Sequence, residues 1–520
     1  MNGKKLEKEV QSLKSEIALK DLQIQHLKKL LYGQKSEKFN PDQWQLQLGL
    51  EDEPGKDQAL PEEEEPVVPK QKIKSRKPRA TKDELLPDDV TIKIKEVIIP
   101  AEVRANPDAW LEIGEEYHDE LEMIPAQLYI LRTIRKKYVS KEDRSLPPVI
   151  CPAPLPTVPG TKCGASLMAG IITDRFVDHL PYYRQEKRYL RIFDATLGRN
   201  TLGYWTGQCA KYLKPINDAI LDEVLSGPVV NVDETPNKYL EKGSGKAQLG
   251  YNWVYRQPAI PGGDNPGGVY FDWQTGRSHQ CLLDILEVDE NGKLKYQGII
   301  QCDGYKAYET LSNRYDVTLA GCLAHVRRKF FEAAEESTNL CRQLLWLIQL
   351  LYGIEAEIRA RALTGWHRQT IRNHQSRPIL KKIYDTIIEE KEKHLPKSGI
   401  GKAIGYALNQ RSRIELYLDD GNLEIDNNVV ENAIRPNKLG AKNWMFIGAK
   451  EAGWRNALFY TMVENCRIQG VDPERYFTEM LRGLPSEEGA ITPALARQWT
   501  PASYARRIRN EEPQLELTAA

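Results

Sequence analysis

The order of strand-like and helix-like patterns between residues 229 and 321 constrains the fold of this chain more than any other feature. Runs of apolar residues predict strands near 229–233, 250–256, 268–273, 298–303 and 317–321. Helical spacing predicts one helix near 279–287, before the fourth strand, and another near 305–312, before the fifth. The chain therefore alternates in a way that favours a mixed sheet with helices against it.

Three strands, a helix, a strand, a helix and a strand is the order of a ribonuclease-H-like domain. In that order the first and fourth strands lie side by side, and each ends in a carboxylate here, Asp233 and Asp303. A third carboxylate, Glu431, lies in Asp-Asn-Asn-Val-Val-Glu-Asn-Ala-Ile-Arg-Pro (426–436), which predicts the start of a helix that Pro436 ends or kinks.

An isolated aspartate at a strand end most often caps a turn or a helix. Three carboxylates in these places also match the ligands of two divalent cations beside a phosphodiester. Mg²⁺ prefers oxygen ligands, and we expect two such ions, with Mn²⁺ as a substitute. We therefore interpret Asp233, Asp303 and Glu431 as both catalytic and metal-binding, and the chain as a polynucleotidyl transferase. Glu234 is an alternative to Asp233, but adjacent strand residues point to opposite faces. Asp426 and Glu424 compete with Glu431, and Asp426, just before the helix, suits a role as its N-cap.

The distance along the chain from Asp303 to Glu431 is too long for one closing helix. Apolar residues recur with helical spacing in its middle, at Leu340, Leu344, Leu347, Leu351 and Ile354. We therefore predict a helical insertion at 332–420, a catalytic domain in two parts at 226–331 and 421–482, and a C-terminal tail at 483–520.

The N-terminal half divides into four further segments. Apolar residues from Leu6 to Leu31 follow a heptad spacing, which predicts a coiled coil at 1–40 and self-association as a parallel dimer, the alternative being one amphipathic helix packed on its own protein. A charged linker at 41–87 follows, with an acidic block and then a basic one. Alternating apolar and polar residues predict a small β-containing module at 88–150.

The fourth segment, 151–225, has an all-helical pattern, with helices expected at Ala165–Val177, Tyr182–Phe193 and Thr201–Leu213. It fits a helix-turn-helix-like DNA-binding module or, equally, a small bundle with a solvated basic face. Its candidate DNA-contacting residues are Arg184, Lys187, Arg188, Arg191 and Arg199.

Two later basic groups are further candidates for DNA contact. Arg327, Arg328 and Lys329 follow Cys322-Leu-Ala-His325, whose cysteine and histidine are too few to form a zinc site. Arg435, spaced to hold Glu431 or to form an ordinary surface pair, and Lys442 lie close to Trp444 and Trp454. These tryptophans either stack on bases or fill the core.

Composition sets limits on these interpretations. The formal net charge is zero, so any basic surface for nucleic acid is local. The eight cysteines form no Cys-x-x-Cys pair and are expected to be reduced thiols in the cytoplasm. The most apolar stretch, Leu344–Ile354, is far shorter than the ~20 residues of a membrane span, so no membrane partner is expected.

Several short motifs, taken in order, resemble the large transposase of the insertion sequence 66 family along nearly the whole chain. They are Tyr32-Gly-Gln-Lys-Ser-Glu-Lys38, His179-Leu-Pro-Tyr-Tyr-Arg-Gln-Glu186, Val232-Asp-Glu-Thr-Pro236, Cys302-Asp-Gly-Tyr305, Cys322-Leu-Ala-His-Val-Arg-Arg-Lys-Phe330, Ile425-Asp-Asn-Asn-Val-Val-Glu-Asn-Ala-Ile-Arg435, Lys442-Asn-Trp444 and Gly470-Val-Asp-Pro473. The resemblance implies a DDE transposase whose triad matches Asp233, Asp303 and Glu431. It also implies a leucine-zipper-like N-terminus, binding to the inverted repeats of a mobile element, and accessory proteins of the same element.

One feature departs from the family pattern. The family commonly carries a zinc-binding module with Cys-x-x-Cys pairs, but residues 88–150 contain no cysteine. We interpret this segment as a divergent, degenerate zinc-finger-like module without metal.

The sequence thus predicts a multidomain α+β protein of the bacterial cytoplasm, associated with the nucleoid, that cleaves double-stranded DNA at element ends and transfers the strands to target DNA. The alternatives are an inactive DNA-binding remnant that occupies element ends, and a glycoside hydrolase with paired carboxylates.

Overall fold

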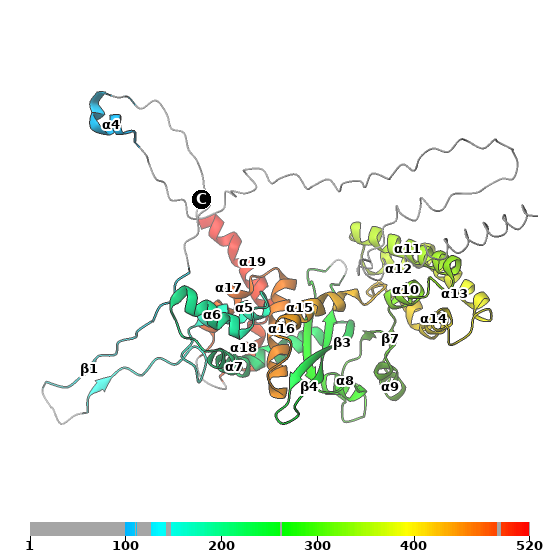
Figure 1. Cartoon of the computed structure of the whole chain (residues 1–520), viewed down its shortest axis with the longest axis horizontal. Helices are drawn as coiled ribbons and strands as arrows, with labels where there is room; N and C mark the ends of the chain where they lie inside the picture. The colour runs from blue at the N-terminus through cyan, green and yellow to red at the C-terminus, as the bar shows by residue number, and fades with distance from the viewer. Residues whose placement is uncertain are drawn as a thin grey trace, which may run out of the picture. The chain divides into compact units, whose positions relative to one another are not determined.

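The computed structural model of the chain describes residues 99–109, 111, 126–141, 147–260, 263–485 and 490–518. It divides into two units, Met1–Ile124 and Pro125–Ala520, which are described separately (Figure 1). The coiled coil predicted at 1–40 and the linker predicted at 41–87 lie outside the described residues. In the first unit the structure has a short helix, α4 (Ala101–Ala105), and a 3₁₀ turn, η1 (Pro107–Ala109).

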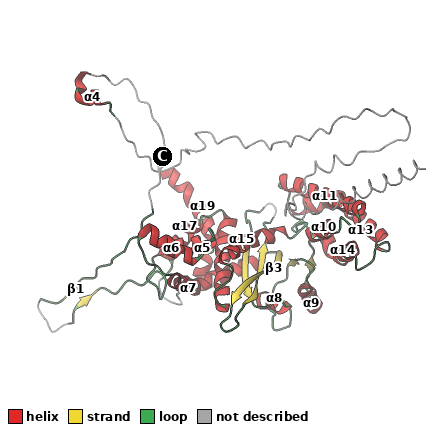
Figure 2. Cartoon of the chain, in the orientation of Figure 1, coloured by secondary structure: helices red, strands yellow, loops and turns green. Residues whose placement is uncertain are grey.

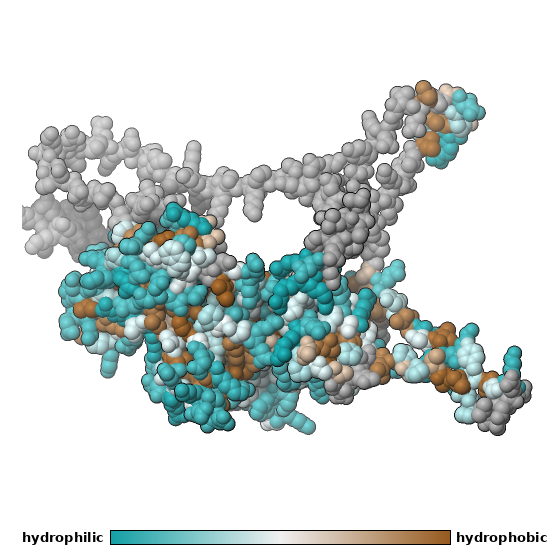
Figure 3. Space-filling view, turned by 180° about the vertical axis from the view of Figure 1, so that it is seen from behind, coloured by the Kyte–Doolittle hydropathy of each residue, from teal (hydrophilic) through white to brown (hydrophobic). Residues whose placement is uncertain are grey.

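The second unit begins with an extended arm that belongs to the predicted β-containing module. The arm holds a two-stranded antiparallel sheet, β1 (Lys137–Tyr138) with β2 (Val149–Ile150). Apolar residues before β1 are open to solvent, with Ile130 87% and Leu131 84% exposed. Figure 3 shows these apolar side chains along the arm at the lower right.

A five-stranded mixed sheet forms the centre of the second unit, with the order β5-β4-β3-β6-β7 (Figure 2). Strand β4 is antiparallel to its two neighbours, β3 and β5. On the other side of β3, β6 is parallel to β3 and β7 is parallel to β6. The elements in chain order are β3 (Val229–Leu240), β4 (Ala247–Gln257), β5 (Gly268–Gln274), α8 (His279–Leu286), β6 (Ile299–Gln301), α9 (Lys306–Arg314) and β7 (Leu319–Ala320). The predicted order of strands and helices is confirmed.

Strand β3 is longer than the sequence pattern predicts, and Asp233 lies within it rather than at its end. Pairing with β6 stops at Asn231 and Gln301, whereas pairing with β4 continues to Leu240. Between Asn231 and Lys238 the strand therefore pairs with another strand on one side only, until a bridge to Ile447 at Tyr239. Pro236 is compatible with that position, because an edge strand tolerates a residue that has no backbone N–H.

The outer strand β5 is covered by α16 (Gly453–Gln469), and side chains of that helix complete its backbone hydrogen bonds. Thr461 Oγ1 accepts the N–H of Phe271 at 2.9 Å. Asn465 accepts the N–H of Val269 at 3.1 Å and donates to its carbonyl oxygen at 2.6 Å. The open edge of the sheet is thereby closed within the protein, which prevents pairing with another strand.

Three helices precede the sheet, α5 (Ala165–Phe176), α6 (Tyr182–Phe193) and α7 (Arg199–Leu225). They match the three predicted helices, although α7 continues well beyond Leu213. Ile171 of α5 and Leu213 of α7 belong to the same hydrophobic core as Trp253 of β4 and Phe459 of α16. The three helices and the sheet therefore bury one shared core.

The segment predicted as a helical insertion is helical throughout and has its own hydrophobic core. Its elements, with the helix that leads into it, are α10 (Leu323–Glu332), α11 (Thr338–Ala360), α12 (Gly365–Ile371), the π-helical turn η2 (Arg372–Ser376), α13 (Arg377–Lys391), α14 (Gly399–Glu415) and the 3₁₀ turn η3 (Leu416–Leu418). A fully buried ion pair joins Arg372 Nε to Glu355 Oε1 at 2.7 Å. Arg372 also donates to the carbonyl oxygens of Tyr417 and Asp420, so the buried charges are well hydrogen-bonded.

The chain then returns to the sheet through α15 (Asn428–Trp444), which carries Glu431 near its start and continues through Pro436. The 3₁₀ turn η4 (Lys450–Ala452), α16, α17 (Pro473–Gly483), α18 (Pro493–Gln498) and α19 (Pro501–Thr518) complete the chain. The predicted C-terminal tail thus contains two helices. None of the described helices is long and apolar enough to span a membrane.

Candidate active site

The parallel pairing of β3 with β6 brings Asp233 and Asp303 to neighbouring positions. Asn231 lies opposite Gln301 in this pairing, and its amide donates to Gln301 Oε1 at 3.0 Å. Asp233 and Asp303 each follow two residues later, and alternate residues of a strand share a face. Both aspartates are half-buried. The register of two strands therefore sets the first two predicted site residues side by side.

Each aspartate uses one carboxylate oxygen to hold the backbone beside it. Asp233 Oδ1 accepts the N–H of Glu234 at 2.9 Å. Asp303 Oδ1 accepts the N–H of Tyr305 at 2.8 Å, in the turn that begins α9. Asp303 therefore also stabilises the turn before α9, which is the role typical of an isolated aspartate at a strand end. Within the described residues Oδ2 of each aspartate accepts no hydrogen bond and is available to a ligand.

A buried polar network holds the start of α15, and with it Glu431, against these strands. Asn427, the residue before the helix, donates from Nδ2 to the carbonyl oxygen of Val232 at 3.0 Å. Its Oδ1 accepts a hydrogen bond from Asn231 Nδ2 at 2.7 Å. Asn231 and Asn427 are both 0% exposed. Because buried amides require partners, this network fixes where the first turn of α15 lies.

Cys322 belongs to the same network. Its Sγ accepts the backbone N–H of Asn427 at 3.2 Å. Burial raises the pKa of the Cys322 thiol to about 12, which keeps the thiol neutral. Cys322 therefore acts as an acceptor for the chain that precedes Glu431, while His325, one turn along α10, faces Glu431 itself.

His325 lies at the candidate site, although from the sequence we predicted no role for it beside the carboxylates. Its Nε2 lies 4.0 Å from Glu431 Oε1. Its Nδ1 is buried and has no hydrogen-bond partner among the described residues. The spacing Cys322-x-x-His325 at the start of a helix was the available signal, because it brings one residue to the network and the other to the glutamate.

The carboxylates repel one another across the site. Burial raises the pKa of Asp233 most, and the negative charges of Glu234, Asp303 and Glu431 raise it further, to about 8. The backbone hydrogen bond from Glu234 lowers it by a smaller amount. The charges of Asp303 and, more weakly, Glu431 therefore both act on Asp233.

The alternative carboxylate Glu234 is occupied on the opposite face of β3. Arg277 Nε donates to Glu234 Oε1 at 2.6 Å, and Tyr308 Oη donates to its Oε2 at 3.0 Å. Tyr305 completes this cluster by donating from Oη to the carbonyl oxygen of Arg277 at 2.8 Å, with the guanidinium 3.9 Å from the centre of its ring. Glu234 thus anchors structure behind the site.

Two further acidic residues near α15 also have structural partners. Asp426 Oδ1 accepts the N–H of Asn428 at 3.0 Å, and its Oδ2 accepts from Tyr352 Oη at 2.8 Å. Glu424 accepts hydrogen bonds from Arg359 at 3.0 Å and Arg368 at 2.7 Å. Asp426 therefore has a structural role at the start of α15, as predicted, but the N-cap residue is Asn427.

A lysine lies beside the carboxylates, two turns along α15 from Glu431. Lys438 Nζ donates to the carbonyl oxygen of Pro236 at 2.7 Å. Burial lowers the pKa of Lys438, and the negative charge of Asp233 opposes this effect. Arg435 is exposed, and within the described residues it forms no ion pair with Glu431. Pro236 and Lys438 therefore join β3 to α15 behind Asp233.

The other predicted DNA-contacting residues lie on four helices, α6, α7, α10 and α15. Arg184, Lys187, Arg191 and Arg199 are exposed on α6 and at the start of α7, whereas Arg188 forms an ion pair with Asp174. Arg327 and Arg328 are half-buried on α10, and Lys329 and Lys442 are exposed on α10 and α15.

The two tryptophans after Glu431 pack within the protein. Trp444 contacts Phe176 and Tyr460, with ring centres 6.5 and 6.3 Å apart. The guanidinium of Arg175 lies 4.5 Å from the centre of the Trp444 ring. Trp454 is half-buried against the same core. Of the two roles that the sequence left open, packing in the core fits this environment.

The donor set suits a divalent cation in its chemistry. Each of the three carboxylates has at least one oxygen without a hydrogen bond among the described residues, and hard cations prefer oxygen ligands. As the described side chains stand, no group of three or more histidines, cysteines, aspartates or glutamates is spaced to hold a metal ion. The ligand chemistry of these residues therefore suits a divalent cation. For the cation to bind, the carboxylates must come closer to one another than they are in this structure.

Comparison with known proteins agrees with this architecture. Residues 160–455 match the family model described as "Transposase IS66 family". Residues 21–91, outside the described part, match the model "Transposase C of IS166 homeodomain".

Relatives that match this chain over most of their length are found in Sinorhizobium fredii. The uncharacterized protein y4jD is 30% identical over 484 residues, which cover 90% of this chain and 91% of the relative. The uncharacterized protein y4qI is 32% identical over 412 residues, covering 76% of this chain and 74% of the relative. The family match spans more than half of the chain and includes all three carboxylates. The chain therefore belongs to the IS66 family of transposases.

Proposed function

We propose that the chain is a DNA transposase that binds the inverted repeats of its element, cleaves DNA there and transfers the freed strands to target DNA. Asp233, Asp303 and Glu431 would be its catalytic carboxylates. The observation that carries this proposal is geometric: the β3–β6 register places the two aspartates on neighbouring strands, and Asn427 holds the start of α15, which carries Glu431, against β3. The negative charges of Asp303 and Glu431 also raise the pKa of Asp233. A cation or a protein side chain that relieves this repulsion is favoured there.

The sheet order supports a ribonuclease-H-like catalytic domain. Across the sheet the strands follow the order β5, β4, β3, β6, β7. β4 is antiparallel to its neighbours β3 and β5, whereas β6 and β7 run parallel to β3. This arrangement sets the first and fourth strands together, and it explains why their carboxylates meet although many residues separate them.

The family generally uses divalent metal ions, and Asp233, Asp303 and Glu431 are the residues that would hold them, with Mg²⁺ as our expectation and Mn²⁺ as a substitute. Two such ions supply activation of the attacking oxygen and stabilisation of the leaving oxygen. The protein's own part is to position the carboxylates: the β3–β6 register places the aspartates, and Asn427 places the helix of Glu431. His325 would orient Glu431, which lies 4.0 Å from it.

The reaction would proceed in two phosphoryl transfers. Water first hydrolyses one phosphodiester at the element end and frees a 3′-hydroxyl. That hydroxyl then attacks a phosphodiester of the target in line, so that one P–O bond forms for each that breaks. Neither step requires a covalent bond to the protein. The exposed basic residues of α6, α10 and α15 would contact DNA phosphates.

The test is strand cleavage of a duplex that carries the element's own inverted repeat, with Mg²⁺. We compare the wild type with Glu431→Gln and with Glu389→Gln, an exposed glutamate of the helical insertion that serves as the matched control. Cleavage by the wild type and the control, but not by Glu431→Gln, is the expected result. Cleavage retained by Glu431→Gln overturns the assignment of the third carboxylate.

Binding of the duplex without cleavage by any variant would contradict the catalytic proposal and favour an inactive DNA-binding remnant. The same assay is run with the accessory proteins of the element added. Cleavage that appears only then keeps the proposal and adds a partner to it.

A further inference from the structure

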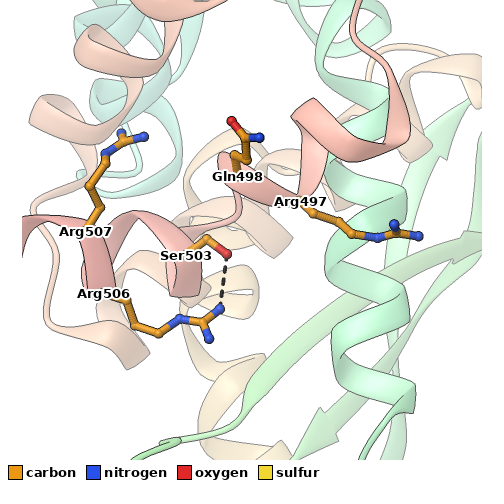
Figure 4. A pocket seen from close by; sticks show the side chains of 5 residues that line it. All are labelled: Arg497, Gln498, Ser503, Arg506 and Arg507. Atoms are coloured by element: carbon orange, nitrogen blue, oxygen red, sulfur yellow. Dashed lines mark hydrogen bonds between the residues drawn. The ribbon is translucent and has the colours of Figure 1, made fainter.

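The helices at the C-terminal end carry a positive surface outside the carboxylate site. Residues 490–510 contain arginines at 497, 506, 507 and 509 and no acidic residue, in a chain whose formal net charge is zero. Arg497, Gln498, Ser503, Arg506 and Arg507 line a pocket of about 420 Å³ (Figure 4). The pocket lies beyond residue 455, where the match to the transposase family model ends.

Hydrogen bonds to neighbouring helices hold the connection between α18 and α19 in place, and with it the backbone that carries the pocket residues. Thr500 Oγ1, fully buried, donates to Glu223 Oε1 of α7 at 2.7 Å. Tyr504 Oη donates to Glu479 Oε2 of α17 at 2.6 Å. Glu479 also forms an ion pair with Arg475, with Nε 2.9 Å from Oε1. The charge of Arg506 acts to lower the pKa of Glu223, and that of Arg507 acts to lower the pKa of Glu479.

The arginines present donors that the protein leaves available. The guanidinium of Arg507 lies 4.3 Å from the centre of the Trp499 ring and 5.2 Å from that of Tyr504. Stacking uses the face of a guanidinium and leaves its in-plane N–H groups for an anion. Arg506 donates to Ser503 Oγ at 3.1 Å. Among the described residues, none of Arg497, Arg506 and Arg507 forms an ion pair with a carboxylate.

The spacing of these arginines indicates the kind of anion. Figure 4 shows the three guanidinium groups spread along the two helices and pointing in different directions, rather than gathered around one point. A small free anion needs donors that converge on it. A nucleic-acid backbone instead offers a row of phosphates, each of which arginine contacts with its fork of N–H groups.

We propose that this pocket, with Arg497, Arg506 and Arg507 on its wall, binds the phosphodiester backbone of duplex DNA at a place separate from the carboxylate site. The inference rests on the proposed transposase function and adds to it a DNA contact made by the C-terminal helices. Because phosphate contacts carry no base sequence, the pocket would contribute equally to binding at element ends and elsewhere.

The test measures how the affinity for a duplex of arbitrary sequence depends on salt, by fluorescence anisotropy of the full chain. Each phosphate contact contributes about 0.9 to the slope of log affinity against log salt concentration. The double variant Arg497→Gln/Arg506→Gln should therefore lower the steepness by about 1.8. The fall in affinity over a fourfold rise in salt would then be about 12-fold smaller than in the wild type.

Two controls separate charge at this place from other effects. Arg361→Gln/Lys381→Gln removes the same charge from exposed residues of the helical insertion, 63% and 69% exposed, and should leave the slope unchanged. Arg497→Lys/Arg506→Lys keeps the charge and should keep the wild-type slope. An unchanged slope in the glutamine variant, or an equal loss in the insertion control, overturns the inference.

The outcomes also separate this inference from the proposed function. A wild-type protein that cleaves its inverted repeat while the pocket variant keeps the full salt slope contradicts only the pocket. A wild-type protein that binds no duplex at any salt concentration contradicts both the pocket and the transposase activity.

Discussion

Asp233→Asn is expected to stabilise the protein at pH 8 in the absence of divalent ions, although it removes a carboxylate of the proposed catalytic site. Burial and the neighbouring carboxylates raise the pKa of Asp233 from 3.8 to about 8. Between about pH 4 and pH 8 the unfolded chain therefore releases a proton that the folded protein keeps. The free energy of unfolding must then fall as the pH rises through this window.

The size of the effect follows from the shift. At pH 8 a pKa that rises by about 4 units corresponds to about 5 kcal/mol of lost stability. The carboxyl group is half-buried and keeps part of its hydration, so we expect about half of this, or about 2–3 kcal/mol. An asparagine amide oxygen still accepts the N–H of Glu234, so the substitution removes the charge and retains that hydrogen bond.

The assay is urea denaturation of the wild type and Asp233→Asn at pH 5 and pH 8 with a chelator, and again with Mg²⁺. We expect a higher midpoint for the variant at pH 8, little difference at pH 5, and stabilisation by Mg²⁺ of the wild type alone. The matched control is Asp272→Asn on β5, whose pKa burial raises only to about 6. The control should gain less stability and keep the Mg²⁺ response. Equal stability of the variant and the wild type at pH 8 would refute the reasoning.

Three further substitutions test the contacts around the site. Asn427→Ala removes two buried hydrogen bonds, so it should lower the free energy of unfolding by about 2–3 kcal/mol and slow cleavage. The control Asn217→Ala, at a buried position away from the site, should lower stability without slowing cleavage. His325→Ala should reduce the cleavage rate by about 10-fold at unchanged DNA affinity, and an unchanged rate would exclude a role in orienting Glu431. Arg372→Leu leaves Glu355 buried beside Arg368 alone and should lower the urea midpoint by the equivalent of about 3 kcal/mol, whereas a second change, Glu355→Leu, should restore much of the loss.

The order of strands and helices in the sheet was predictable because each element shows its burial in its own periodicity. A strand with one face in the core alternates apolar and polar residues, and an amphipathic helix repeats about every 3.6 residues. The positions of Asp233, Asp303 and Glu431 within the elements could be predicted for the same reason, since each lies beside a strongly patterned run, whereas their catalytic role stays a proposal. The helices of the insertion followed from the spacing of Leu340 to Leu351.

The lengths of elements were less predictable, because partners decide them. β3 continues through Pro236 since its pairing with β4 outlasts its pairing with β6. α15 continues through Pro436 because residues on both sides of the proline, Ile434 and Asn437, are packed in the interior. In both places a proline favours the end of the strand or helix, but the contacts made by the rest of the element outweigh it.

By itself, the sequence determined the order of elements and the family, and it predicted the three candidate carboxylates, because these depend on residue type and local spacing. Only the tertiary structure decided which residues hold the carboxylates together. Asn231, Cys322 and Asn427 are far apart in sequence and have no pattern of their own, yet they meet in one buried network. The same holds for His325, which acquires its partner Glu431 only when α10 packs near α15. Contacts of this kind depend on which segments meet, and local periodicity carries no information about that.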